Sequence, residues 1–300
     1  MKKKTLLFGA GAGCRKFIKN EQQKRIFLAV IDNDISRKGE DFEGIKIINP
    51  QSIEKYNFDE IVVTTQWAEQ VKKQLIYDLK IDENKVYVPP KISFKNPQPF
   101  MGKDTYDLAL NILTVLCRRA YEDKINLFID FGTLLGIVRD KTIMQWDDDI
   151  DFAVHIKDSG EIENWLINII NVNNFPVKFN IKRNVDKDNN IVELTLNFES
   201  SAYNSFCTSI SFREDINGNS IHLPSLGLWY AESKHFLKYD EILWRGILVK
   251  VPYDYKKYLE FVYGDWETTK KFINMTDYNN LGNVDFNEVK KMGFRSEEIK

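Results

Sequence analysis

Four aspartates stand close together near the middle of the chain, in the run Asp147-Asp148-Asp149-Ile150-Asp151. From Asp149 onward acidic and apolar residues alternate, so Asp149 and Asp151 fall on one side of a predicted strand. Asp147 shares that side if the extended backbone begins there. Carboxylates on one face repel one another, and no basic residue lies between them. A divalent cation would relieve the repulsion and leave coordination positions open for phosphate oxygens, so the run predicts a metal–phosphate site.

Glycines and basic residues precede these acids. The stretch Gly132–Gly136 reads Gly-Thr-Leu-Leu-Gly and follows a predicted strand, and Arg139 and Lys141 come next. A strand, a Gly-Thr turn, a helix and an Asp-x-Asp strand make up the nucleotidyltransferase arrangement, in which the turn holds phosphates and two aspartates hold Mg²⁺ or Mn²⁺. We therefore expect Gly132–Gly136 to be a phosphate-binding turn. The simpler interpretations are a solvated acidic loop and, for Lys141, an exposed lysine.

The start of the chain offers a second candidate site. Gly9, Gly11 and Gly13 follow an apolar strand and precede a helix, and Asp32 ends the next predicted strand. Glycines allow close approach of a phosphate, a helix N-terminus attracts it, and an acid at this place can bind a ribose. The fingerprint is incomplete, because the position of the third glycine is Cys14 or Lys16. A turn that needs small residues only for packing remains the alternative.

The whole chain limits the classes of function. Its 300 residues suffice for two domains, and a net charge of −2 argues against a nucleic-acid binder. No apolar run has the length of a membrane span, so we expect at most peripheral membrane contact. The three cysteines are far apart in the sequence, and no two of them form a Cys-x-x-Cys motif. This spacing indicates neither a disulfide framework nor a zinc site. We expect a cytoplasmic protein.

The hydrophobic pattern predicts two domains. Residues 1–92 alternate strand and helix and predict a small α/β Rossmann-like domain with a parallel sheet. The proline-rich segment 93–102 is the predicted linker. Residues 103–300 predict an α+β nucleotidyltransferase-like domain with a mixed sheet, which contains a long helix at Lys103–Lys124, strands at Ile191–Phe198 and Phe206–Phe212, and a hairpin turn at Asn217-Gly218.

Two motifs resemble one known family. The first is Gly132-Thr133-Leu134-Leu135-Gly136, Arg139 and Gln145-Trp146-Asp147-Asp148-Asp149-Ile150-Asp151. The second comprises Trp244-Arg245-Gly246, Val251-Pro252, Tyr258-Leu259 and Tyr263-Gly264-Asp265-Trp266. Both are similar to the signature of the LicD/fukutin-like phosphotransferases, over roughly residues 105–270. This family transfers a phospho-linked group, such as phosphocholine or ribitol phosphate, from a CDP-activated donor to a glycan hydroxyl.

The resemblance implies roles for particular residues. Asp149 and Asp151 match the metal-binding and catalytic pair, and Gly132 and Thr133 match the phosphate side of the site. Arg139 matches a basic residue that clamps the donor pyrophosphate. Trp146 and Asp148 belong to the motif, although Trp146 is as well explained by packing.

One position departs from the family pattern. Where the family has a further aspartate on a later strand, this chain has serine at Ser209 and Ser211. Without that acid the acceptor hydroxyl lacks an evident general base. Glu193, Glu214 and Asp215 are the acids that could replace it. His155 shares the face of Asp149 and Asp151 and could also reach the site, although a lone histidine at a strand end is more often structural.

The sequence thus predicts a metal-dependent transferase that moves a phosphocholine-like or alditol-phosphate-like group from a CDP-linked donor. The acceptor would be a sugar hydroxyl of a capsule, lipopolysaccharide or teichoic-acid precursor. Two alternatives remain open. One is a nucleotidyltransferase that acts on a small molecule, and the other is a non-catalytic nucleotide-binding protein that has lost its third acid.

Overall fold

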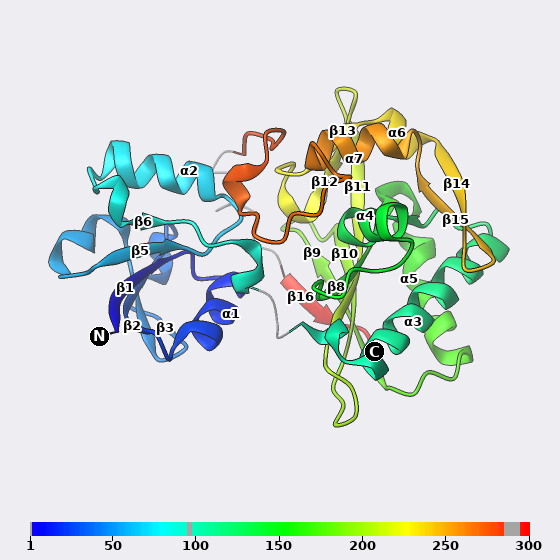
Figure 1. Cartoon of the computed structure of the whole chain (residues 1–300), viewed down its shortest axis with the longest axis horizontal. Coiled ribbons are helices and arrows are strands. Elements are labelled where there is room, and N and C mark those ends of the chain that lie inside the picture. Colours follow the sequence, from blue (N-terminus) through cyan, green and yellow to red (C-terminus); the bar gives the residue numbers. More distant parts are fainter. Residues whose placement is uncertain (1, 95–97, 285–294) are drawn as a thin grey trace. The chain divides into compact units, whose positions relative to one another are not determined.

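The computed structural model describes residues 2–94, 98–284 and 295–300, and the chain divides into two compact units (Figure 1). The N-terminal unit contains Met1–Asn96 and also Lys270–Asn279, and the C-terminal unit contains Pro97–Thr269 and Asn280–Lys300. The predicted domain of residues 103–300 therefore differs from the observed unit. The backbone N–H of Lys91 donates to the carbonyl of Ile273 at 2.8 Å, and Lys91 Nζ donates to the Tyr278 hydroxyl at 2.9 Å. These bonds attach the late segment to the N-terminal unit.

The predicted linker 93–102 is only partly visible, since residues 95–97 lie outside the described part of the chain. Short 3₁₀ turns stand on either side of them, at Lys91–Phe94 and Pro99–Met101.

The N-terminal unit is a mostly parallel sheet with the order β3-β4-β2-β1-β5-β6. Its strands are β1 (Lys3–Phe8), β2 (Arg25–Ile31), β3 (Asp41–Phe42), β4 (Ile45–Ile48), β5 (Glu60–Val63) and β6 (Val86–Tyr87). The helix α1 (Ala12–Glu21) connects β1 to β2, and α2 (Ala68–Lys73), continued by a π-helical turn at Gln74–Asp78, connects β5 to β6. Only the β3–β4 pair is antiparallel within this sheet as described. The predicted Rossmann-like α/β fold is confirmed.

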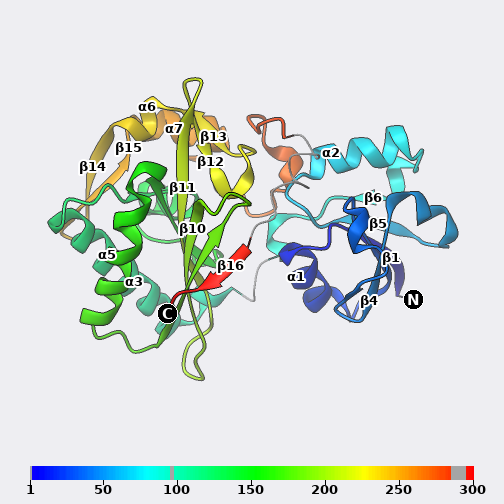
Figure 2. The ribbon, with the colours of Figure 1, turned by 180° about the vertical axis from the view of Figure 1, so that it is seen from behind.

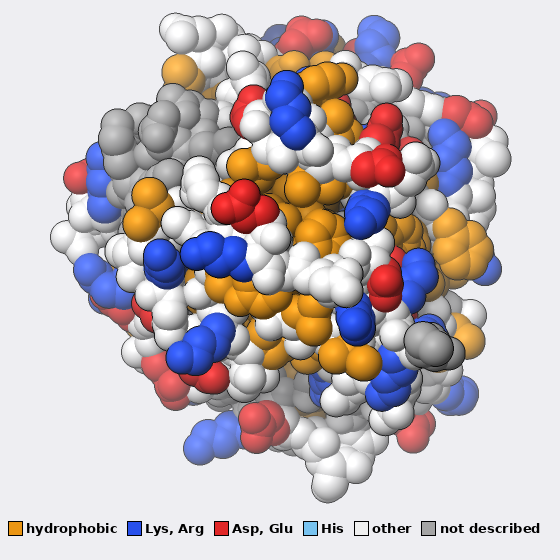
Figure 3. Space-filling view, turned by 90° about the vertical axis from the view of Figure 1, so that its left-hand side faces the viewer, with side chains coloured by type: hydrophobic (Ala, Val, Ile, Leu, Met, Phe, Trp, Pro, Cys, Tyr) orange, Lys and Arg blue, Asp and Glu red, His pale blue; other side chains and the backbone are white. Residues whose placement is uncertain are grey.

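Helix α1 packs on one face of this sheet through Cys14 and Phe17, against Leu7, Val30 and Val62. One side of the unit is seen in Figure 3, where apolar side chains gather between scattered charged groups. The large apolar side chains that are exposed in this unit include Ile26, Ile35, Tyr77 and Tyr87.

The C-terminal unit is built on a mixed sheet. Its path is β13-β12-β11-β10-β9-β16, and β8 joins it by pairing in parallel with β11 and antiparallel with β7. The strands are β7 (Phe128–Ile129), β8 (Asp149–His155), β9 (Phe179–Val185), β10 (Ile191–Phe198), β11 (Cys207–Ile216), β12 (Asn219–His222), β13 (Tyr230–Glu232) and β16 (Arg295–Glu298). A separate ribbon pairs β14 (Tyr239–Trp244) with β15 (Ile247–Pro252). The mixed α+β fold expected for this part is confirmed.

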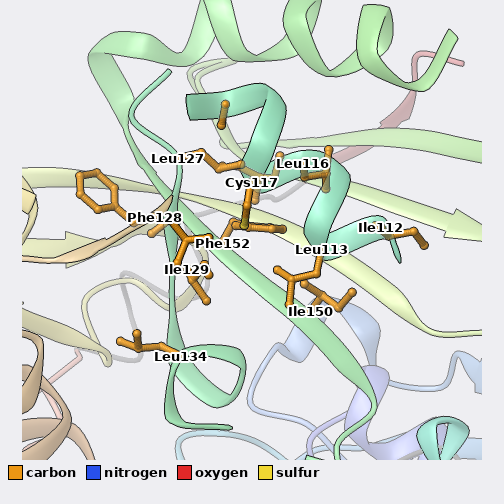
Figure 4. Close-up of a cluster of buried hydrophobic side chains, with 14 of the residues drawn as sticks. Ile112, Leu113, Leu116, Cys117, Leu127, Phe128, Ile129, Leu134, Ile150 and Phe152 are labelled. Carbon is orange, nitrogen blue, oxygen red and sulfur yellow. The ribbon is translucent and has the colours of Figure 1, made fainter. Parts of the chain in front are cut away.

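Five helices are described in this unit. They are α3 (Lys103–Glu122), α4 (Phe131–Asp140), α5 (Ser159–Val172), α6 (Lys234–Leu237) and α7 (Tyr255–Tyr263). The long helix α3 and α5 lie on the same side of β8, β10 and β11 in both views (Figures 1 and 2). Side chains of α3 such as Leu113 and Leu116 meet Ile150 and Phe152 of β8 in the core (Figure 4).

The other side of this sheet is polar. Half-buried and buried residues alternate along the whole of β10. The same alternation is seen in the first parts of β8 and β11. Because Ile150 and Phe152 enter the core, Asp149 and Asp151 lie on the opposite face. We call this side the polar face. The predicted turn at Asn217-Gly218 is also confirmed, since both residues have positive φ (51° and 81°) between β11 and β12.

Among the described residues no helix is both long and apolar enough to cross a bilayer.

Candidate active site

Three of the predicted acids converge. One carboxylate oxygen from each of Asp147, Asp148 and Asp149 lies within 4.8 Å of the other two. Asp147 and Asp148 come from the loop before β8 and are only 6% and 7% exposed. Carboxylate oxygens this close together could hold a hard divalent cation, which prefers such ligands. The tight cluster therefore includes Asp147 and Asp148, whereas the sequence singled out Asp149 and Asp151.

Asp151 lies one pleat further along the polar face. Its backbone N–H donates to the Thr133 hydroxyl at 2.9 Å, and its carboxylate accepts from the Ser209 hydroxyl at 3.1 Å. Burial, and then the negative charges of Asp149, Asp147 and Asp130, raise the pKa of Asp151 well above its usual value. A cation bound nearby would relieve this repulsion.

The predicted turn at Gly132–Gly136 is wrong, because these residues form the first turns of α4. Neither Gly132 nor Gly136 has a positive φ, so the backbone conformation does not require glycine at these positions. Glycine is needed there because other atoms come close. A Cβ on Gly132 would lie 2.4 Å from Asp147 Oδ2, and one on Gly136 would lie 2.7 Å from the carbonyl oxygen of Thr142. Glycine at both places lets α4 lie against the loop that carries the acids. A phosphate-binding turn and a helix packed against a loop both need a residue without a Cβ where another group comes close. The sequence alone therefore could not distinguish the two.

A buried ion pair lies next to this arrangement. Asp130 caps α4 by accepting from the N–H of Phe131 at 2.8 Å, and its own N–H donates to the carbonyl of Asp151 at 3.0 Å. Arg213 of β11 donates to Asp130 Oδ2 from Nη2 at 2.8 Å and from Nε at 3.2 Å. The Tyr258 hydroxyl of α7 donates to Asp130 Oδ1 and accepts from Arg213 Nη2 at 3.2 Å. Asp130, Arg213 and Tyr258, which we call the buried triad, are at most 1% exposed.

The basic residues of the motif have local partners. Arg139 donates to both carboxylate oxygens of its neighbour Asp140, at 2.9 and 2.8 Å. Lys141 ends α4 with φ of 62°, and its Nζ donates to the carbonyl of Val138 at 2.9 Å. Trp146 is half-buried in the turn before the acids. To hold a donor phosphate, Arg139 has to exchange Asp140 for it.

The acids that could replace the missing carboxylate lie in different places. Glu193 of β10 faces the same side as Asp151, because Glu193 pairs with Ser211 and Asp151 pairs with Ser209 in the adjoining ladders. Burial raises the pKa of Glu193, against the hydrogen bonds from Asn184, at 2.6 Å, and Ser211. Glu214 follows on the opposite face and is exposed.

Asp215 and His155 form a pair at the far end of β8. The Nε2 of His155 lies 3.1 Å from Asp215 Oδ2, and its Nδ1 accepts from the N–H of Lys157. This pairing places both residues away from the acid cluster, four residues along the strand from Asp151. Of the candidates, Glu193 lies on the polar face two strands from Asp151 and one pleat along.

The candidate site of the N-terminal unit has mostly internal contacts. Gly9 has φ of +105°, and a Cβ on Gly13 would lie 2.5 Å from the carbonyl oxygen of Thr64, so both glycines are required by the fold. Asp32 accepts from the N–H of Ala10 at 3.0 Å, which ties β2 to the glycine loop. Gly11 differs from the other two, because a Cβ there would meet nothing within 4 Å.

Two parts of this chain match known families. Residues 124–254 match the family described as LicD/FKTN/FKRP, nucleotidyltransferase domain. The chain carries a LicD-type domain. Residues 1–87 match a second family, described as C2185-like, N-terminal. The LicD-type domain contains the acid cluster, Asp130 and Arg213, and it indicates a transferase that acts on glycan-related substrates.

Likeness to solved structures is weak. A UDP-D-quinovosamine 4-dehydrogenase from Vibrio fischeri is 26% identical over 29% of this chain and 75% of that chain, with a TM-score of 0.23. An oxidoreductase from Thermotoga maritima is 10% identical over 92% of both chains, with a TM-score of 0.26. A Rex-family repressor is 12% identical over 27% of this chain and 42% of its own, with a TM-score of 0.23. Scores this low carry no argument. A search of curated proteins finds no match.

Sequence reasoning missed Asp130 and Arg213 of the buried triad, and it named Tyr258 only as part of the second motif. Asp130 had a signal, because an aspartate between an apolar strand and a helical pattern is a preferred N-cap. Arg213 had no such signal, because it directly precedes Glu214 and Asp215 and so looks like part of an exposed charged run. That its partner is Asp130, 83 residues earlier, follows only from the fold of the LicD-type domain.

Proposed function

We propose that this protein is a metal-dependent transferase that moves a phospho-linked group from a CDP-activated donor to a hydroxyl of a cell-surface glycan precursor. The convergence of Asp147, Asp148 and Asp149 within 4.8 Å, with Asp151 one pleat away, carries the proposal. The donor set fits Mg²⁺ or Mn²⁺, because all the converging atoms are hard carboxylate oxygens. A divalent cation bound there would neutralise charge on the transferring phosphoryl group.

The chain's own residues would orient the reactants. Asp149 and Asp151 lie on the polar face, and Thr133 and Ser209 fix the backbone and carboxylate of Asp151. Gly132 makes room for the carboxylate of Asp147. We place the donor pyrophosphate over this cluster, with Arg139 as its clamp after release of Asp140.

In the proposed transfer, the acceptor hydroxyl oxygen bonds to the donor phosphorus that carries the transferred group. The bond from that phosphorus to the bridging oxygen breaks, and CMP leaves with the bridging oxygen. The hydroxyl proton goes to a base, for which we propose Glu193. Burial raises its pKa, which makes its carboxylate a stronger base than an exposed glutamate.

Thermal unfolding of the metal-free protein, measured with Mn²⁺ and CDP, is the first test. A ligand that binds only the folded state raises the melting temperature, by an amount set by its affinity. We expect a rise that needs both components and that is absent in Asp149→Asn. Asp158→Asn is the matched control, since Asp158 lies outside the site at the start of α5. A nucleotide shift that persists in Asp149→Asn without metal would move the nucleotide to another site and contradict the proposal.

The released products then separate the reactions. Incubation of CDP-ribitol or CDP-choline with a glycan acceptor should release CMP and leave a phosphodiester on the sugar. Release of pyrophosphate from CTP, with a nucleotidylated acceptor, would instead identify a nucleotidyltransferase. Binding of nucleotide without release of any product would indicate that the serine at position 209 has left a non-catalytic protein.

A further inference from the structure

The polar face continues sideways from the acid cluster across three more strands. In the β8–β11 ladder Asp149 and Asp151 pair with Cys207 and Ser209. Ser209 pairs with Thr195 of β10, and Thr195 pairs with Lys182 of β9. Partners in a ladder point to the same face, so these side chains form a row that starts at Asp151.

A second row runs beside the first. Asn197 of β10 pairs with Asn180 of β9, one pleat from Thr195 and Lys182, on the same face. We call the combined surface the polar floor. Its members are Cys207, Ser209, Thr195, Asn197, Asn180 and Lys182, and all six are half-buried. Their strand neighbours Ile181, Leu194 and Leu196 are at most 1% exposed, so the alternation has put apolar groups below and polar groups above.

The chemistry of the polar floor is that of neutral hydrogen-bonding groups. Asn197 Nδ2 donates to the Thr195 hydroxyl at 3.2 Å, which fixes both side chains and leaves the Thr195 proton and the Asn197 carbonyl for other partners. Asn180 Oδ1 is buried and has no hydrogen-bond partner among the described residues. A buried acceptor without a donor costs free energy, which a ligand hydroxyl would recover if the Asn180 side chain turned its amide toward the surface. Lys182 is the single charged member of the polar floor.

This composition excludes other occupants. The six members include no aromatic ring for stacking a nucleobase, and no aliphatic side chain for a lipid tail. Hydroxyl and amide groups, which both donate and accept, match the hydroxyls of a sugar. Three strand spacings separate Asp151 from Lys182, so the row is about 14 Å long, which is more than one sugar ring needs.

We propose that the polar floor binds the carbohydrate part of the acceptor and presents one of its hydroxyls toward Asp151. This inference rests on the proposed function, because the acid cluster supplies the reaction at the end of the row. It identifies a binding surface on β9, β10 and β11 and a ligand class, a neutral glycan that extends across the strands.

The test is binding of free sugars to the full chain, measured by saturation-transfer NMR with Mg²⁺ and CMP present. The probes are glucose, galactose, N-acetylglucosamine, N-acetylgalactosamine and rhamnose, with disaccharides of each. The floor variant is Thr195→Val/Asn197→Val, which keeps β-favouring side chains and removes the linked polar groups. Thr114→Val is the control, since the Thr114 hydroxyl bonds only locally to the carbonyl of Leu110 on α3. Asn180→Leu serves as a second floor variant if the double variant does not fold.

We expect at least one sugar to bind wild type and Thr114→Val equally. The floor variants should bind it roughly tenfold more weakly, as expected for loss of one or two hydrogen bonds. Equal binding by the floor variants would overturn the inference, and so would the absence of any sugar signal with wild type at millimolar concentration. The rise in melting temperature with Mn²⁺ and CDP is measured on the same samples. If wild type shows no such rise in melting temperature, the proposed function fails. If it is lost only in the floor variants, the floor holds the donor and the inference fails.

Discussion

Replacement of Arg213 by methionine tests the buried triad most directly. The change removes the guanidinium and keeps a long flexible side chain, so the cavity it leaves is small. Asp130 would keep the N–H of Phe131 and the hydroxyl of Tyr258 but lose both bonds from Arg213, at 2.8 and 3.2 Å. Its carboxylate is fully buried and would then lie in the core without a counter-ion.

The expected magnitude follows from this burial. Removing one member of a buried ion pair typically costs about 3–5 kcal/mol, because the remaining charge is neither hydrated nor paired. Replacing both members is close to neutral in known cases, so Asp130→Asn/Arg213→Met should recover most of the loss. For a unit of this size, each kcal/mol lowers the melting temperature by roughly 2–4 °C. The single variant should therefore melt about 6–20 °C below wild type.

Melting temperatures from circular dichroism of wild type, Arg213→Met, Asp130→Asn and the double variant form the assay. The same four proteins in a urea titration give the coupling free energy between the two residues. A loss below about 1 kcal/mol in Arg213→Met, the range of exposed pairs, would show that the charge is not buried in solution. A double variant as unstable as the single one would show that Arg213 acts through packing and not through its charge.

Three further predictions concern the same unit. Gly132→Ala places a Cβ 2.4 Å from Asp147 Oδ2. We expect the free energy of unfolding in urea to fall by about 1–3 kcal/mol and Mn²⁺ binding, measured by calorimetry, to weaken. The control is Gly160→Ala, whose Cβ meets nothing within 4 Å and should leave both quantities unchanged. Because folding raises the pKa of Asp151, the folded state binds more protons than the unfolded chain, so metal-free wild type should lose stability as the pH rises above the ordinary pKa of an aspartate. Asp151→Asn should therefore melt at a higher temperature than wild type at neutral pH. A lower melting temperature would contradict the burial of the Asp151 charge. Burial, and then the charge of Arg213, lower the pKa of His222 in the folded state, so the unfolded chain takes up this proton more readily. As the pH is lowered below about 6.5, the free energy of unfolding should therefore decrease, by up to roughly 1.4 kcal/mol per pH unit. Melting curves of His222→Gln should lack this dependence on pH.

Much of the C-terminal unit could be predicted from local pattern. The alternation after Asp149 gave the strand and its two faces, and Asn217-Gly218 gave the hairpin, because both signals depend on neighbouring residues only. The parallel pairing of β8 with β11 joins residues 58 positions apart, such as Asp151 and Ser209, and no local pattern encodes that. The bonding of Lys270–Asn279 to the N-terminal unit is non-local in the same way. The polar floor also depends on register between distant strands, and it could not be predicted before the ladders were known.

The serine at position 209 has a structural consequence beyond the absence of an acid. As the ladder partner of Asp151, an aspartate there would add another carboxylate to a place where Asp149, Asp147 and Asp130 already raise the pKa of Asp151. Serine instead donates a hydrogen bond to that carboxylate, which favours its charged, metal-binding form. Serine thus favours the charged form of Asp151, which a cation would need, and in the proposed mechanism proton acceptance falls to another residue. Glu193 lies on the same face, two strands from Asp151 and one pleat along, and is held by Asn184 and Ser211; it is the acid that we propose for that task. If so, Glu193→Gln should lower turnover while leaving Mn²⁺ affinity unchanged, whereas Ser209→Ala should weaken Mn²⁺ binding.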